Sequence, residues 1–379
     1  MPILIPLLLG YAAMSAASQA ALQPAVATPP TLAEARRDMG IPSQGDVRGL
    51  RDTVGFASTP EQMARVWELS ATAPAPELLG APPVEPVAGT ICPHDDYLYA
   101  GRVYRRVLPL VRAKTVILFG VFHKYRRFGA HDVMVFDSYR AWRAANGEVL
   151  VSPLREALLT RLPAGDAVRD NAAHDSEHSI EALVTWLRHL RADLEIVPVI
   201  VPAMNFERMQ ALSRDFGVAL GAVMRERGLV LGRDVAVVIS SDAIHYGADF
   251  GHTPFGDGGV GPYVSAGERD RALLTGPLAG AVTVDKVRAF FAACVDPADP
   301  SQYRLTWCGR FAIPLGVLAL AETARAGGLA APVGVPIAYS TSIGSPELPV
   351  RATGMGATAP ANLYHFVGYP GLAFVLGAR

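Results

Sequence analysis

Three histidines of this chain follow apolar runs that are typical of buried strands. They are His94 after the run at 85–92, His123 after TVILFGVF, and His245 shortly after VAVVISS. In open α/β sheets, residues beyond the carboxyl ends of strands meet at one edge, where ligands bind. One such histidine would more often be structural, whereas three of the nine histidines at equivalent strand ends favour a common site.

The chemistry that such a set favours is metal binding. Imidazole suits iron, zinc, copper and nickel, and a site of two histidines and one anionic ligand leaves positions open for substrate or oxygen. Asp242 stands three residues before His245, so the two would face the same way if a helical turn follows the strand. The carboxylate could then orient the imidazole, or the pair could act as an acid and base beside the metal.

Two further segments carry candidate residues with competing interpretations. In HDSEHSIEAL, Asp175 or Ser176 could cap a helix whose acidic first turn complements its dipole, or Glu177 and His178 could support the site. Cys308, in TWCGR, stands at an expected junction between a loop and a helix. A helix N-terminus lowers the pKa of a thiol, and a thiolate is a soft metal ligand; the alternative is an inert buried thiol.

The elements that must position these residues alternate along the chain. Near-continuous β-branched runs at 85–92, 115–122, 194–202 and 235–241 predict strands covered on both faces. Helical patterns lie between them, in GRVYRRVLPLVR, HSIEALVTWLRHLR and FERMQALSRDFGVALGAVMRER. The alternation predicts a layered α/β/α domain around a central, mostly parallel or mixed sheet.

The last third of the chain is expected to complete this domain. HTPFGDGGVGPYVSAGERD has too many glycines for regular structure and predicts a loop. Two helices are expected at VDKVRAFFAACV and FAIPLGVLALAETARA, and two closing strands at VPIAYSTSIG and LYHFVGYPGLAFVLG.

Composition narrows the function classes. Lys plus Arg is 34 and Asp plus Glu is 35 in 379 residues, so the chain lacks the basic excess of a nucleic-acid-binding protein. Three scattered cysteines do not make a disulfide framework. No later apolar run reaches the roughly 18 residues of a membrane span.

The expected organisation has three parts. Residues 1–20 resemble a signal peptide but lack a basic beginning, so periplasmic export and a cytoplasmic location both stay open. Residues 21–50 are expected to form an Ala/Pro-rich linker, and residues 51–379 a single α/β domain.

Several motifs, in order over about residues 50 to 376, match those of a known family. PHDDYLYAG resembles the PHAGY-type motif of the Memo family, LFGVFHK its LGPSHH motif, EHSIEAL its EHSIE motif, SSDAIHYG its SSDFSHYG motif, and WCGRFAIPLGVL its CGRxPI segment. The chain therefore resembles the Memo family, many of whose bacterial members are named AmmeMemoRadiSam system protein B.

The resemblance implies a fold and a site. Memo proteins share the fold of the class III extradiol ring-cleaving dioxygenases, of the protocatechuate 4,5-dioxygenase β-subunit type. For this chain it implies an iron or copper site held by His94, His123 and Cys308, with Asp242 and His245 nearby. The third ligand of the dioxygenases is a glutamate, so ring cleavage does not follow from the shared fold.

This chain departs from the family motifs at four positions. Asp95 and Asp96 replace the Ala-Gly of the first motif, Lys124 replaces the second histidine of the His-His pair, and Phe311 replaces the histidine that usually follows CGR. These changes leave the three implied ligands in place and alter the charge around them.

Three functions fit these observations. The first is a mononuclear enzyme dependent on Fe(II) or copper, with redox chemistry on a small-molecule substrate and His245, oriented by Asp242, moving protons. The second is a non-catalytic metal-binding or redox-modulating protein. The third is a hydrolase that uses zinc to activate water.

Overall fold

The computed structural model describes residues 40–377 and contains one large sheet. Along its main path the strands are β1 (Val47–Arg48), β6 (Ala141–Ala144), β7 (Gly147–Val151), β9 (Glu195–Val201), β4 (Thr115–Val121), β10 (Val235–Ser240), β3 (Gly89–Cys92), β16 (His365–Leu376), β15 (Pro332–Thr341) and β12 (Gly280–Ala281). Four strands join it off this path, namely β2 (Glu77–Leu78), β5 (Met134–Phe136), β8 (Ala167–Arg169) and β11 (His245–Gly247). A separate hairpin pairs β13 (Val295–Asp296) with β14 (Asp299–Tyr303).

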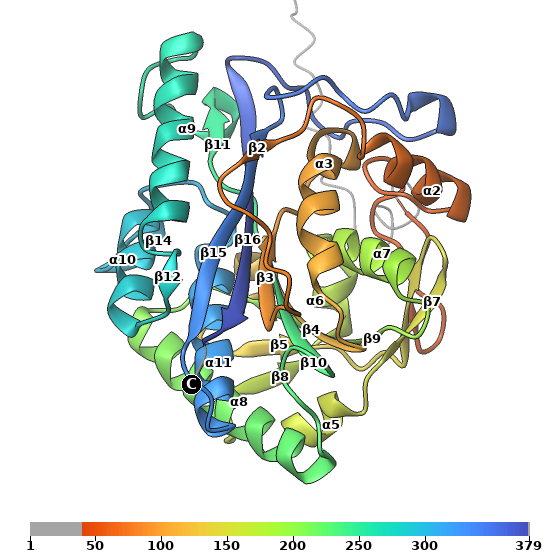
Figure 1. Ribbon diagram of the computed structural model, residues 1–379, viewed down its shortest axis with the longest axis vertical. Coiled ribbons are helices and arrows are strands. Elements are labelled where there is room, and N and C mark those ends of the chain that lie inside the picture. The colour runs from red at the N-terminus through yellow and green to blue at the C-terminus, as the bar shows by residue number, and fades with distance from the viewer. Residues whose placement is uncertain (1–39, 378–379) are drawn as a thin grey trace, which may run out of the picture.

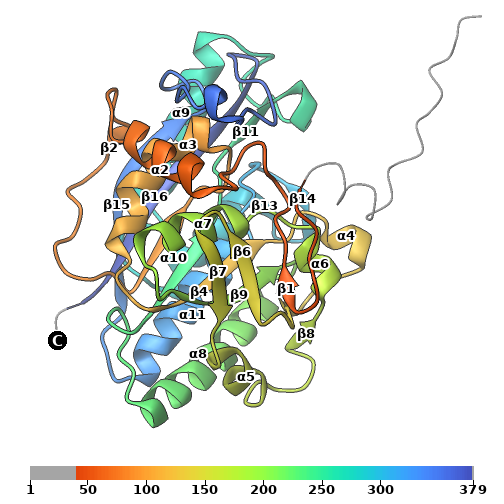
Figure 2. The same cartoon turned by 90° about the vertical axis from the view of Figure 1, so that its right-hand side faces the viewer.

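Helices cover both faces of the sheet (Figures 1 and 2). The helices are α2 (Pro60–Leu69), α3 (Tyr97–Val107), α4 (Tyr125–Phe128), α5 (Leu154–Leu159), α6 (Asn171–Asp175), α7 (Glu181–Leu190), α8 (Phe206–Arg227), α9 (Val260–Thr275), α10 (Val284–Cys294) and α11 (Ala312–Ala326), with short 3-10 turns η1 (Leu108–Leu110), η2 (Ala248–Phe250) and η3 (Arg351–Thr353). Because side chains alternate along a strand, Val116 and Leu118 of β4 pack with α3 and α7, whereas Ile117 and Phe119 pack with α8 and α11. The predicted α/β/α layering is confirmed.

The central strands run parallel and end at the same edge. β10 lies between β3 and β4 and pairs in parallel with both, and β9 continues the parallel set beyond β4. The C-terminal strands differ, because β16 pairs antiparallel with β3 and with β15. The sheet is therefore mixed, with a parallel centre that delivers the residues after β3, β4 and β10 to one place.

The prediction of a loop over residues 252–270 is wrong for the second half of this segment. The glycines at 256, 258 and 259 have positive φ angles and form an irregular segment. Helix α9 begins directly afterwards at Val260 and continues to Thr275, in spite of two further glycines. Clustered glycines thus mark the start of this helix, and the irregular segment ends earlier than the glycine content predicts.

Residues 40–50 belong to the folded domain and not to the predicted linker. Here β1 pairs in parallel with β6. The remainder of the expected linker and the signal-like segment 1–20 lie outside the described residues. Within the described residues, no helix is both long and apolar enough to cross a membrane.

The buried side chain of Arg48 ties β1 to the segment before α7. Its guanidinium forms an ion pair with buried Glu181 and donates to the carbonyl oxygens of His174 and Glu177. It also lies 4.2 Å from the ring centroid of Trp142. Arg48 therefore holds the turn that carries Glu177 and His178.

We expect Arg48→Ala to lower the free energy of unfolding by about 3–5 kcal/mol, because it leaves the Glu181 carboxylate buried and unpaired. Urea unfolding followed by circular dichroism measures this change. Arg140→Ala is the control, since Arg140 pairs with Asp46 and Glu148 on the exposed surface and should have a much smaller effect. Equal effects of the two substitutions would contradict this account of Arg48.

Candidate metal centre

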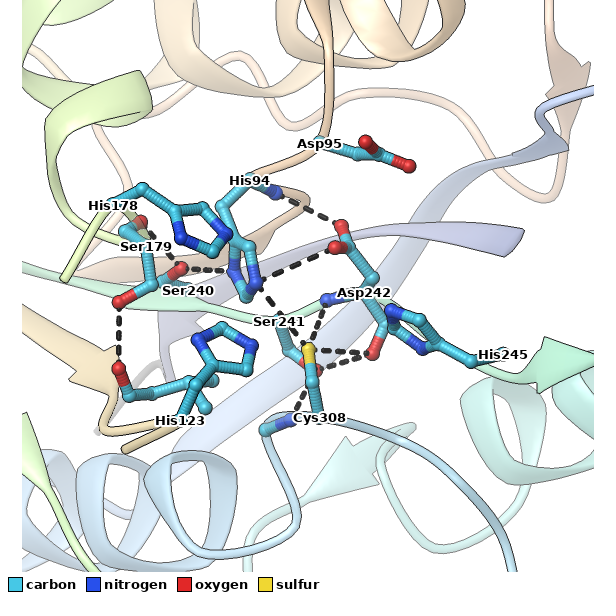
Figure 3. Close-up of polar contacts among 12 residues, drawn as sticks. His94, Asp95, His123, His178, Ser179, Ser240, Ser241, Asp242, His245 and Cys308 are labelled. Carbon is cyan, nitrogen blue, oxygen red and sulfur yellow. Dashed lines mark hydrogen bonds and ion pairs between the residues drawn. The ribbon is translucent and has the colours of Figure 1, made fainter. Parts of the chain in front are cut away.

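The histidine after β3 and the aspartate after β10 meet because their strands are in register. Cys92 at the end of β3 pairs with Ser240 at the end of β10. Two residues further along each chain segment, the backbone N–H of His94 donates to Asp242 Oδ1 over 2.9 Å. Figure 3 shows both side chains beside Cys308, which comes from the loop before α11.

Hydrogen bonds determine which nitrogen of His94 is available. The hydroxyl of Ser240 donates its one proton to the carbonyl of Ser179 over 2.7 Å, so it must accept from His94 Nδ1, 2.5 Å away. Nδ1 therefore carries the proton, and Nε2 keeps a free lone pair. Burial, followed by the neighbouring His123, lowers the pKa of His94 well below its ordinary value, so the imidazole is neutral.

Two other potential ligands surround His94 Nε2. Asp242 Oδ2 lies 3.4 Å from it and Cys308 Sγ lies 3.5 Å from it. Neighbouring ligand atoms of a tetrahedral zinc ion, bound at about 2.1–2.3 Å, lie roughly 3.4–3.6 Å apart. All three residues are buried. The two distances from His94 Nε2 are therefore those expected between neighbouring ligands of one metal ion.

Backbone contacts hold Cys308 in this position. The N–H of Asp242 donates to Cys308 Sγ over 2.9 Å, and the N–H of Gly309 donates to Ser241 Oγ over 3.1 Å. A Cβ atom at residue 309 would lie 2.3 Å from Ser241 Oγ, so only glycine permits this close approach.

The expectation that a helix N-terminus lowers the pKa of Cys308 is wrong. Helix α11 begins only at Ala312. Burial, and after it the charge of Asp242, raises the pKa of the Cys308 thiol well above its usual value. A metal ion would be needed to deprotonate this thiol near neutral pH, because a coordinating thiol loses its proton to the metal.

A second group of imidazoles shares His94. His123 Nδ1 lies 2.9 Å from Glu177 Oε1, and the rings of His123 and His178 stack with centroids 4.9 Å apart. Since a carboxylate only accepts, His123 carries its proton on Nδ1 and leaves Nε2 free. Burial would raise the pKa of Glu177, but His123 and His178 together hold it well below its ordinary value.

The role of the EHSIE segment follows from these contacts. Helix α7 begins at Glu181 and has no side-chain cap, so neither Asp175 nor Ser176 caps it as the first interpretation required. Glu177 instead accepts hydrogen bonds from the backbone N–H groups of His123, His178 and Ser179. Glu177 therefore orients His123.

The predicted pairing of Asp242 with His245 is wrong. No helical turn follows β10, and His245 instead opens strand β11. His245 Nδ1 lies 3.2 Å from the carbonyl oxygen of Ala243 and 3.1 Å from that of Thr306. These two acceptors orient the imidazole and leave Nε2 unprotonated, while Asp242 holds His94.

The four departures from the family motifs have separate environments. Asp95 accepts from the hydroxyl of Tyr369 over 2.7 Å, and Asp96 accepts from the backbone N–H of Thr358 over 2.6 Å. Phe311 is buried in the core on the α8 and α11 face. Lys124 lines the cavity next to the histidines.

The structure brings the implied ligands together in two groups that share one residue. His94, Asp242 and Cys308 form one, and His94, His123 and His178 form the other, with the ligand atoms of each group within 4.8 Å of one another. His123 and Cys308 both lie next to His94 but fall in different groups. The donor chemistry fits a metal ion, because the rings of His94 and His123 each form a hydrogen bond through Nδ1 and leave Nε2 free to bind the ion.

The layered sheet and its buried His/Asp/Cys group define an α/β protein whose strand ends can hold a metal ion. The profile of the Memo-like protein family matches residues 56–341, and the chain belongs to this family. It is similar to MEMO1 family proteins of Pyrococcus abyssi (27% identical over 178 residues), Thermococcus kodakarensis (27% over 177) and Archaeoglobus fulgidus (30% over 163). These matches cover 45%, 45% and 43% of this chain and 56% of each relative, so the chain spans about half the length of the curated relatives it matches.

Sequence reasoning missed two residues that orient the imidazoles. Ser240 fixes the tautomer of His94, and Thr306 offers its carbonyl to His245. Ser240 was visible as the polar end of an apolar strand, whereas nothing in the sequence around Thr306 distinguishes it.

We expect Ser240→Ala to weaken binding of Zn²⁺ about 10–100-fold, because loss of a partner that orients a metal-binding histidine has this effect. Competition with a chromophoric chelator measures the affinity. Ser213→Ala is the matched control, since that buried hydroxyl also donates to a carbonyl, of Leu315, but on α8. The same loss of affinity in both variants, or in neither, would contradict the role assigned to Ser240.

Proposed function

We propose that this protein is a mononuclear metal-dependent redox enzyme that binds iron or copper through His94, His123 and Cys308. The observation that carries the proposal is the 3.5 Å approach of Cys308 Sγ to a His94 Nε2 whose ring is fixed through Nδ1. A buried thiol and imidazole are ligands that bind copper and iron well. A bound iron or copper ion would supply one-electron and oxygen chemistry.

The protein's own groups would prepare a small-molecule substrate for that chemistry. His245 keeps an unprotonated Nε2 and is only partly buried, so it can accept a proton from a substrate hydroxyl. Asp242 holds the backbone of His94, and Glu177 holds the ring of His123. The contact with Glu177 restricts the ring of His123 to one orientation, and the contact with Ser240 does the same for the ring of His94.

A non-catalytic metal-binding protein is the second candidate. Asp242 Oδ2 lies as close to His94 Nε2 as Cys308 Sγ does. If Asp242 also binds the ion, protein ligands would fill four positions, as they do in structural metal sites. Metal binding would then serve storage or redox modulation instead of turnover.

The metal content of anaerobically purified protein, measured by elemental mass spectrometry, tests the site. We expect about one iron or copper per chain, lost in His94→Ala and in Cys308→Ala. Cys294→Ala and His131→Ala are the controls, since Cys294 is a buried thiol on α10 and His131 is exposed. Zinc retained in Cys308→Ala would favour a hydrolase, and no metal in the wild type would contradict the proposal.

Oxygen consumption with a catechol tests the redox activity. We expect His245→Gln to keep its metal and to lower the rate about 10²–10⁴-fold, the usual contribution of a general acid or base. His252→Gln, seven residues further along, is the control. Metal-loaded wild type that shows no turnover with any aromatic diol would leave the non-catalytic candidate.

A further inference from the structure

A small cavity opens beside the imidazoles of the candidate metal centre. Its volume is about 180 Å³, and its wall includes His94, His178 and Phe56. This is less than the 300–1,000 Å³ of pockets for drug-sized ligands and equals the volume of about six water molecules in the liquid. The cavity is therefore suited to a small molecule that contacts the metal-binding histidines.

Two cationic side chains stand in the cavity wall. Arg51 and Lys124 both line the cavity, and neither forms an ion pair within residues 40–377. Arg51 Nη1 is buried and has no hydrogen-bond partner among the described residues. Among the described residues, Lys124 Nζ donates to the carbonyl oxygen of Ser176 over 3.0 Å. The positive charges of Arg51 and Lys124 in the wall therefore attract an anion into the cavity.

The position of Arg51 is fixed by the same carboxylate that binds Arg48. The backbone N–H of Arg51 donates to both oxygens of Glu181, over 2.9 and 2.7 Å. The side chain of Arg51 starts from this anchored backbone, and Arg51 and Lys124 line the same cavity. An anion in the cavity would be attracted by both positive charges.

The acidic residues of the cavity are occupied by internal donors. Asp52 accepts from the backbone N–H groups of Val54 and Gly55. Asp95 and Asp96 accept from Tyr369 and Thr358, as described above. These occupied carboxyl groups leave Arg51 and Lys124 as the groups of the cavity wall that can hold an anion.

The geometry points to a carboxylate subsite: Arg51 and Lys124 bind the carboxylate of a small organic acid whose body lies against Phe56 and extends toward His94. This inference rests on the proposed function, and it assigns the substrate class as small carboxylic acids. Arginine is suited to this task because its planar guanidinium can donate two parallel hydrogen bonds to one carboxylate.

Calorimetric titration with benzoate and with benzamide, its neutral analogue, tests the subsite on protein whose metal content is measured in the same preparation. We expect benzoate to bind the wild type and benzamide to bind at least tenfold more weakly. Arg51→Gln and Lys124→Gln should each weaken benzoate binding about tenfold or more, the usual effect of losing a charge-assisted hydrogen bond. Arg127→Gln is the control, because it removes an equal charge from exposed α4, outside the cavity wall.

The outcomes separate this inference from the proposed metal site. Metal-loaded protein that binds no benzoate, or binds benzamide equally well, would overturn the carboxylate subsite and leave the metal site standing. Benzoate binding that Arg51→Gln and Lys124→Gln leave unchanged would place the acid on the metal and would also overturn the subsite. Loss of benzoate affinity in both variants, with unchanged metal content, supports the carboxylate subsite. Wild-type protein without metal would contradict the proposed function, independently of the subsite.

Discussion

The parallel register of β3 and β10 is the constraint on which the candidate metal centre depends. Cys92 pairs with Ser240, and this pairing places His94 next to Asp242. A slip of one residue would turn the following side chains to the opposite face of the sheet. Helices on both faces oppose such a slip, because alternate residues of each central strand are buried against different helices.

Within the site, hydrogen bonds occupy the polar atoms that do not face the candidate ion. The Nδ1 atoms of His94, His123 and His245 all have acceptors, namely a hydroxyl, a carboxylate and two carbonyl oxygens. Buried polar groups need partners, and the atoms that face the candidate ion are ring nitrogens, one carboxylate oxygen and one thiol. The network that stabilises the fold at this edge therefore also selects the atoms that can bind a metal.

Much of this arrangement could be predicted from local sequence. The apolar runs predicted the central strands, and the residues at their ends predicted His94, His123 and His245 as members of one site. The family motifs added Cys308, which is distant in sequence and joins the site only through the packing of α11. The motif order thus supplied a long-range contact that periodicity alone cannot provide.

Other features depend on tertiary contacts that no local pattern encodes. β1 forms because β6 offers a free edge and because Arg48 finds Glu181, 133 positions along the chain. The orientation of His245 depends on the carbonyl of Thr306, which a distant loop delivers. The pKa of Cys308 rises because the surrounding core is closed, whereas the sequence indicated only an approaching helix.

The most direct test of a shared histidine and cysteine site is an X-ray absorption spectrum at the K-edge of the bound metal. Our account predicts one sulfur neighbour at about 2.3 Å together with imidazole nitrogens at about 2.0–2.1 Å, values typical of such ligands. A spectrum with nitrogen and oxygen neighbours only would contradict the account, because it would remove Cys308 from the metal.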